Sequence, residues 1–134
     1  GAPIVVDEGA RSLYHAALTH GANHLITVVG QTMQLLRAAG VSEPEALTGP
    51  LLRSSLDNAL RLGDAALTGP VARGDVDTVS AHLEVIAQQD LSIAKTYAAL
   101  AAATAERAQL VELLDSVGRG RVDRVISTFY SAED

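Results

Sequence analysis

Apolar side chains recur at spacings of three and four residues through most of this 134-residue chain, which is the period of amphipathic α-helices. No stretch of useful length alternates apolar and polar residues, so the pattern predicts no β-sheet. The hydrophobic residues are mostly Ala, Leu and Val, with only three tyrosines and one phenylalanine as aromatic residues. This composition favours closely packed helices. The sequence therefore predicts an all-α fold.

The first predicted helix runs from about Glu8 to Ala39 and ends at Gly40. Residues 12–36 contain no Asp, Glu, Lys or Arg. Three histidines, an asparagine and two glutamines interrupt this stretch too often for a helix that spans a membrane. A helix without a charged face is buried on nearly all sides. We therefore expect a helical bundle around this long central N-terminal helix, covered by a second copy of the chain or by a partner domain.

The second predicted helix begins at a capping box, Ser42-Glu43-Pro44-Glu45, that places a proline at an early helical position. We expect residues 48–50 (TGP) to interrupt and restart it, and Gly63 to end it.

Two aspartates mark the next helix starts. Asp75 and Asp90 are the expected N-caps, and the second of these helices is expected to continue until Gly118 and Gly120. A final helix is expected over about 121–131. The apolar stripes of these three helices predict the core: Val76, Val79, Leu83 and Ile86; Ile93, Tyr97, Leu100, Thr104, Ala108, Val111 and Leu114; Val122, Val125, Ile126 and Phe129.

Charge and composition narrow the function classes. A net charge of -6 without a run of Lys or Arg argues against a nucleic-acid binder. The absence of cysteine excludes disulfides, thiolate zinc sites and a cysteine nucleophile. No basic segment followed by an apolar one begins the chain, so we expect a cytoplasmic protein.

The length fits one domain. Residues 1–7, with Pro3, are expected to be a linker from a missing upstream domain, because Gly1-Ala2-Pro3 is not a natural start. Residues 8–134 are expected to form a single all-helical domain.

The loop before Asp75 contains the first candidate site. Thr68, Gly69 and Arg73 would place a hydroxyl, backbone amides and a guanidinium around one small volume, which suits an anion such as a phosphate or carboxylate. The alternative is a structural connection between helices, in which Gly69 and Gly74 adopt positive φ angles, Asp75 caps the next helix and Arg73 pairs with a nearby aspartate.

A second candidate site lies on the first helix. His15, Thr19 and Asn23 are four residues apart and therefore share one face, where they could line a cleft with His15 as an acid or base. The alternative is that they bond neighbouring helices at an interface. His20 and His24 are also four apart, but no H-E-x-x-H pattern accompanies them, and we predict no metal site.

Some catalytic motifs are missing. The chain has no nucleophile triad, no phosphate-binding GxxxxGK[ST] and no GxGxxG. We expect His82, beside the apolar stripe of its helix, to be a partly buried structural histidine.

Several segments together resemble a known family: residues 13–17 (LYHAA), Asn23, residues 50–52 (PLL), Asn58, residues 67–75 (LTGPVARGD), Val79 and residues 82–83 (HL). They resemble the C-terminal helical domain, of unknown function, of Rossmann-like oxidoreductase-like proteins. That domain is similar to the dimerisation domains of 6-phosphogluconate dehydrogenase and pyrroline-5-carboxylate reductase. The resemblance implies a homodimer and an upstream Rossmann domain that binds NAD or NADP, with a small-molecule substrate between the domains and no cofactor in this chain alone.

The resemblance has a limit. Relatives that oxidise β-hydroxyacids carry a lysine and an asparagine four apart on the corresponding helix, whereas Lys95 is the only lysine here and lies elsewhere. Their chemistry is therefore not carried over.

In the full-length protein, His15 is the candidate proton donor or orienting group. Thr19 and Asn23 are candidate substrate hydrogen-bonders, and the loop residues are candidate anion contacts. The alternative function is a non-enzymatic helical interaction or dimerisation module.

Overall fold

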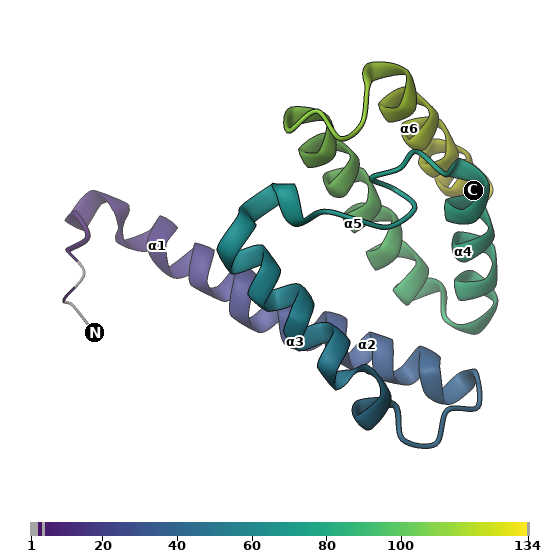
Figure 1. Ribbon diagram of the computed structural model, residues 1–134, viewed down its shortest axis with the longest axis horizontal. Helices are drawn as coiled ribbons and strands as arrows, with labels where there is room; N and C mark the ends of the chain where they lie inside the picture. Colours follow the sequence, from purple (N-terminus) through teal and green to yellow (C-terminus); the bar gives the residue numbers. More distant parts are fainter. Residues whose placement is uncertain (1–2, 4, 134) are drawn as a thin grey trace. The chain divides into compact units, whose positions relative to one another are not determined.

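The computed structural model describes residue 3 and residues 5–133, and every regular element in that part of the chain is a helix (Figure 1). The predicted all-α fold without a sheet is therefore confirmed for these residues. The chain divides into two compact units, Gly1–Pro44 and Glu45–Asp134, and each is described by itself. That residues 8–134 form one domain stays a prediction. The predicted linker, residues 1–7, lies partly outside the described residues; Pro3 and residues 5–7 have no helical structure.

The first unit is one nearly continuous helical rod. A 3-10 turn, Glu8–Ala10, leads into α1, Arg11–Leu18. A π-helical turn, Thr19–Asn23, then joins α1 to α2, His24–Ala38. The predicted helix from about residue 8 to residue 39 is confirmed in its extent, but the π turn was not predicted.

The rod ends at Gly40, as predicted. Gly40 has a φ of 94°, a left-handed conformation that glycine adopts without steric cost. The amide of Gly40 donates to the carbonyl of Arg37, and the amide of Val41 donates to that of Leu36, both at 3.0 Å. These two bonds form a Schellman motif, which satisfies carbonyls that the end of a helix leaves unpaired.

The helix α3, Pro44–Leu62, starts at the last residue of the first unit and forms the beginning of the second, followed by a 3-10 turn, Gly63–Ala66. The predicted interruption at residues 48–50 is wrong, because Pro50 lies inside one continuous helix. Proline removes a single amide donor from the helical ladder, and the bonds on either side of it hold the remaining turns. The predicted end at Gly63, whose φ is 62°, is confirmed.

Three further helices follow: α4, Val76–Gln89; α5, Leu91–Leu110; and α6, Ser116–Ser131. The predicted N-caps are confirmed, since Asp75 accepts from the amide of Thr78 and Asp90 from the amide of Ile93, each at 3.3 Å.

The predicted boundary between the last two helices is wrong. The helix α5 ends at Leu110, and Glu112 has a φ of 62° just beyond it. Asp115 then accepts a 2.7 Å hydrogen bond from the amide of Gly118 and starts α6. The glycines expected to stop α5 therefore lie inside α6. A Cβ at Gly118 would lie 2.5 Å from Leu114 Cδ1, so a larger residue at this position requires the Leu114 side chain to move.

The core of the second unit surrounds α5, which packs against both α4 and α6. Its buried face is a row of alanines: Ala94, Ala98, Ala101, Ala105 and Ala108. Small side chains let neighbouring helices approach closely, so larger residues on α4 and α6 fill the space above the row. Val79, Leu83, Val122 and Ile126 supply this contact, and Val71 and Ala72 anchor the preceding loop to the same core.

Within the described residues, no helix combines the length and the apolar character that crossing a bilayer requires.

Candidate functional site

The candidate residues of the first helix lie along the rod around its π turn. His15 is exposed on α1, Thr19 is half-buried at the first position of the π turn, and Asn23 is exposed at the last. None of the three side chains has a hydrogen-bond partner among the described residues. The π turn contains more residues per turn than an α-helix, so Asn23 is rotated from the face predicted for it. Single π turns within α-helices occur frequently at functional sites.

His20 and His24 contact each other on the same turn. Their Nδ1 atoms are 2.8 Å apart, and the rings meet edge to face with their centroids 4.9 Å apart. At that distance one Nδ1 carries the proton and the other accepts it. No group of three His, Cys, Asp or Glu side chains that could hold a metal is found among the described residues. The two histidines are therefore described as a hydrogen-bonded pair.

Three amides of the candidate loop are bonded within the loop itself. The amides of Arg73, Gly74 and Asp75 donate to carbonyls of Gly69, Val71 and Pro70 at 2.9–3.2 Å. Because these amides already have partners, they are not free for an anion. The side-chain groups that remain for one are the hydroxyl of Thr68 and the guanidinium of Arg73, both on exposed residues.

The glycine conformations and the helix cap predicted for a structural connection are confirmed, whereas no ion pair of Arg73 with Asp75 or Asp77 is found among the described residues. Gly69 and Gly74 have φ angles of 94° and 69°. Asp75 caps α4 through the amide of Thr78 and also accepts from its hydroxyl at 2.7 Å. These bonds from Thr78, aided by the nearby charge of Arg73, lower the pKa of Asp75.

His82 differs from its prediction as a partly buried residue, because it is exposed on α4. Its Nδ1 lies 2.9 Å from the hydroxyl oxygen of Tyr97 on α5, and the two rings meet edge to face. Burial raises the pKa of Tyr97, so the neutral phenol is the favoured form in this contact. The contact joins the outer sides of two core helices.

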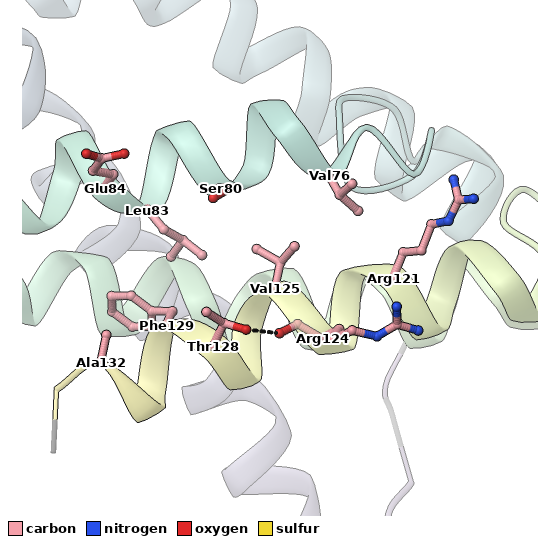
Figure 2. Close-up of a pocket in the computed structure, with 10 residues that line it drawn as sticks. All are labelled: Val76, Ser80, Leu83, Glu84, Arg121, Arg124, Val125, Thr128, Phe129 and Ala132. Carbon is pink, nitrogen blue, oxygen red and sulfur yellow. Dashed lines mark hydrogen bonds between the residues drawn. The ribbon is translucent and has the colours of Figure 1, made fainter.

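Sequence reasoning missed a groove between α4 and α6. Its volume is about 590 Å³, and Figure 2 shows its two walls. The lining residues are Val76, Ser80, Leu83 and Glu84 of α4 with Arg121, Arg124, Val125, Thr128 and Phe129 of α6, together with Ala132. Several of the apolar members were predicted as core. The groove stays open because the short side chains of Ser80, Thr128 and Ala132 stand between them. Neither helix by itself carries a sequence signal for the groove.

Charged side chains mark the two ends of the groove. Arg121 and Arg124 direct their guanidinium groups to the end near Val76, and the carboxylate of Glu84 lies toward the other end (Figure 2). None of these three has an ion-pair or hydrogen-bond partner for its charged group among the described residues. By contrast, Arg119 of the same helix contacts Asp123 at 3.1 Å.

Comparison with protein families gives one match. The family model described as Domain of unknown function (DUF2520) matches residues 1–104, which include α1 to α4 and most of α5. The match names no activity, and α6 lies outside the matched residues. Comparisons with curated proteins and with solved structures found no match. Because the family model covers most of the chain, the chain belongs to the DUF2520 family, a domain of unknown function.

Proposed function

We propose that this chain is a dimerisation domain whose contact surface is the α1–α2 rod, residues 11–38. One observation carries the proposal: residues 12–36 contain no charged side chain, and large apolar side chains of this stretch are exposed. Leu13 is 74% exposed and Ile26 is 72% exposed, with Leu18 and Leu25 also open to solvent. Several large apolar side chains exposed on one uncharged helix indicate an interaction site.

The size of the rod fits a dimer contact. A helix of this length is about 42 Å long and about 10 Å across, so one side of it offers on the order of 650 Å². A stable protein interface buries about 800 Å² per partner. One side of the rod therefore supplies most of the area that each copy of a dimer needs.

A second copy is the partner that the charge pattern favours. The whole chain carries a net charge of -6, so two copies repel each other wherever their charged surfaces meet. The uncharged rod is the surface on which two copies can meet without that repulsion. A two-fold contact also uses the same surface on both subunits, which a single uncharged rod provides.

We further propose that the full-length protein is an NAD(P)-dependent oxidoreductase, with NAD or NADP bound by an upstream Rossmann domain. This proposal rests on the resemblance of residues 13–17 and 67–75 given above. In it, His15 is the proton donor or orienting group, and Thr19 and Asn23 bond the substrate. The free side chains of these three residues support the assignment. Thr68, Gly69 and Arg73 would contact an anionic substrate group, with Arg73 the principal contact because its guanidinium carries a positive charge.

The dimer is tested by measuring mass in solution. Sedimentation velocity of the chain over a wide concentration range should show a monomer–dimer equilibrium, and Ile26→Glu should shift it to monomer. The matched control is Leu110→Glu, because Leu110 is 74% exposed but lies on α5. It should leave the equilibrium unchanged. A wild-type chain that stays monomeric at the highest concentration, or equal effects of the two substitutions, would overturn the proposal.

The oxidoreductase is tested on the full-length protein. NAD(H) or NADP(H) should raise its thermal midpoint, because a ligand that binds only the native state stabilises that state. His15→Ala and Arg73→Ala should then lower substrate turnover without lowering the midpoint. A protein that dimerises through the rod but gains no stability from any dinucleotide would instead be a non-enzymatic interaction module, the alternative function.

A further inference from the structure

We propose that the groove between α4 and α6 binds an amphiphilic organic anion, with an apolar body on the groove floor and an acidic group beside Arg121 and Arg124. None of the residues that line the groove is assigned to the substrate or belongs to the α1–α2 rod, and the proposal does not depend on the proposed function.

The floor of the groove suits an apolar body. Val76 and Leu83 on α4 face Val125 and Phe129 on α6, and the short side chains between them leave the floor open (Figure 2). Val76, Val125 and Phe129 pack against the core from its edge and remain partly exposed. An apolar ligand would therefore cover surface that now contacts water, which is a favourable change of about 25 cal/mol per Å² buried.

The charged residues at the two ends of the groove determine the charge of the ligand that binds and the orientation in which it binds. Arg121 and Arg124 offer two guanidinium groups at one end, and these have no partner among the residues described. Guanidinium groups bind carboxylates and phosphates through paired hydrogen bonds. Glu84 toward the other end repels an anion in the reversed orientation. The ligand is therefore expected to bind with its acidic group at the arginine end.

Charge complementarity also argues against a second copy of the rod as the occupant. Residues 12–36 carry no charge, so the rod would cover Arg121, Arg124 and Glu84 without pairing any of them. Burying unpaired charges is costly. The volume agrees with a small molecule, because about 590 Å³ lies within the range of roughly 300–1,000 Å³ that ligand sites occupy. A body of about 10–20 non-hydrogen atoms fills such a volume, at about 30 Å³ for each water-sized group.

The test uses three soluble probes of nearly equal size: 4-phenylbutyrate, 4-phenyl-1-butanol and 4-phenylbutylamine. Binding to the 134-residue chain is followed by NMR chemical shifts of backbone amides in α4 and α6. We expect 4-phenylbutyrate to bind at least tenfold more tightly than the alcohol and the amine. Acetate, which has the charge without the apolar body, should cause no saturable shift. Equal affinity for the acid and the alcohol, or saturable shifts outside α4 and α6 only, would overturn the proposal.

Charge-neutralising variants locate the site. The double variant Arg121→Gln, Arg124→Gln should reduce the affinity for 4-phenylbutyrate at least tenfold, to that of the alcohol. The double variant Arg53→Gln, Arg61→Gln removes the same charge from α3 and should leave binding unchanged.

Two further measurements complete the test. Glu84→Gln should not weaken binding, because Glu84 makes no contact with the acidic group in the proposed orientation. Far-UV circular dichroism of all variants checks that the helices persist. If the α4 and α6 amides shift with protein concentration in the absence of probe, a second copy occupies the groove and the proposal is wrong.

Discussion

The two units of this chain are equally helical but differ in what their apolar residues contact. In the second unit, alanines of α5 and larger residues of α4 and α6 form a core in which Val79 and Val122 are fully buried. In the first unit, Met33 of α2 and Pro44 at its end are the buried residues among those described. The chain thus contains one segment that buries its apolar face within its own unit and one that leaves most of that face exposed.

The comparison separates helix formation from helix burial. Both units contain good helix formers and clear end signals, such as Gly40 in the first and Gly63 in the second. These local features suffice to define helices. Burial requires a facing surface, and nothing within the first unit covers Leu13 or Ile26 of the rod. Leu51 and Leu60 of α3 are also exposed, so the second unit too contains a helix with open apolar side chains.

The largest effect is expected from truncating a core leucine. Leu83 is 2% exposed, so Leu83→Ala removes buried surface and leaves a cavity, and should cost about 2–5 kcal/mol of unfolding free energy. Leu13→Ala is the matched change on the exposed rod and should change the stability of the monomer by less than about 0.5 kcal/mol. Urea denaturation at low protein concentration measures both. Similar losses for the two variants would contradict the comparison.

Amide hydrogen exchange should distinguish the units within one experiment. Amides of residues 98–108 in α5 should exchange on the order of 100-fold more slowly than those of α1, because the open states of a core helix cost more free energy than those of an exposed helix. Raising the protein concentration should slow exchange along α1–α2 and leave α5 unchanged. Slow exchange of α1 at every concentration would mean that the rod does not need a second copy.

Removal of an N-cap should cost less than removal of a core side chain. Asp90 accepts a hydrogen bond from the amide of Ile93, so Asp90→Ala should lower the unfolding free energy by about 1 kcal/mol. Asp115→Ala, which frees the amide of Gly118, should have a similar effect. Asp7 precedes the first helical turn but caps nothing with its side chain, and Asp7→Ala is the control that should change nothing measurable. A loss at Asp7 as large as that at Asp90 would contradict this assignment.

The smallest effect is a pH dependence at Asp75. Hydrogen bonds from Thr78 hold the pKa of this exposed carboxyl below its ordinary value of 3.8. The carboxylate therefore contributes stability above the ordinary pKa, and that contribution disappears as the pH falls through the lower, folded-state pKa. Thermal midpoints between pH 6 and pH 2 should fall more for the wild type than for Asp75→Asn, which does not titrate. Parallel curves would show that Asp75 contributes no pH-dependent stability.

Sequence reasoning succeeded where a signal is local. The caps at Asp75 and Asp90 and the glycine ends at residues 40 and 63 are each specified by a residue that acts on its immediate neighbours. It failed at Pro50, where the surrounding turns of α3 outweigh one missing bond. It also failed at Gly118, which was taken as a helix end but serves as the place where Leu114 packs on α6.

The candidate sites likewise include features that local sequence signals predict and features that they do not. The positive φ angles of the loop were predictable because only glycine adopts them freely. That the loop amides bond to the loop itself was not predictable, since several partners at similar sequence distance compete for each donor. The groove was missed because its residues come from two helices some 40 positions apart, and no pattern within either helix shows what the other leaves uncovered.

The amino-acid sequence by itself determined that the chain is helical, where most of its helices begin and end, and that one long stretch carries no charge. These properties depend on interactions between residues a few positions apart. Only the tertiary structure decided that α5 is the centre of a core, that alanines line it, and that α4 and α6 leave a groove with arginines at one end. These properties depend on which helix faces meet, and that choice is made by the packing of the whole unit.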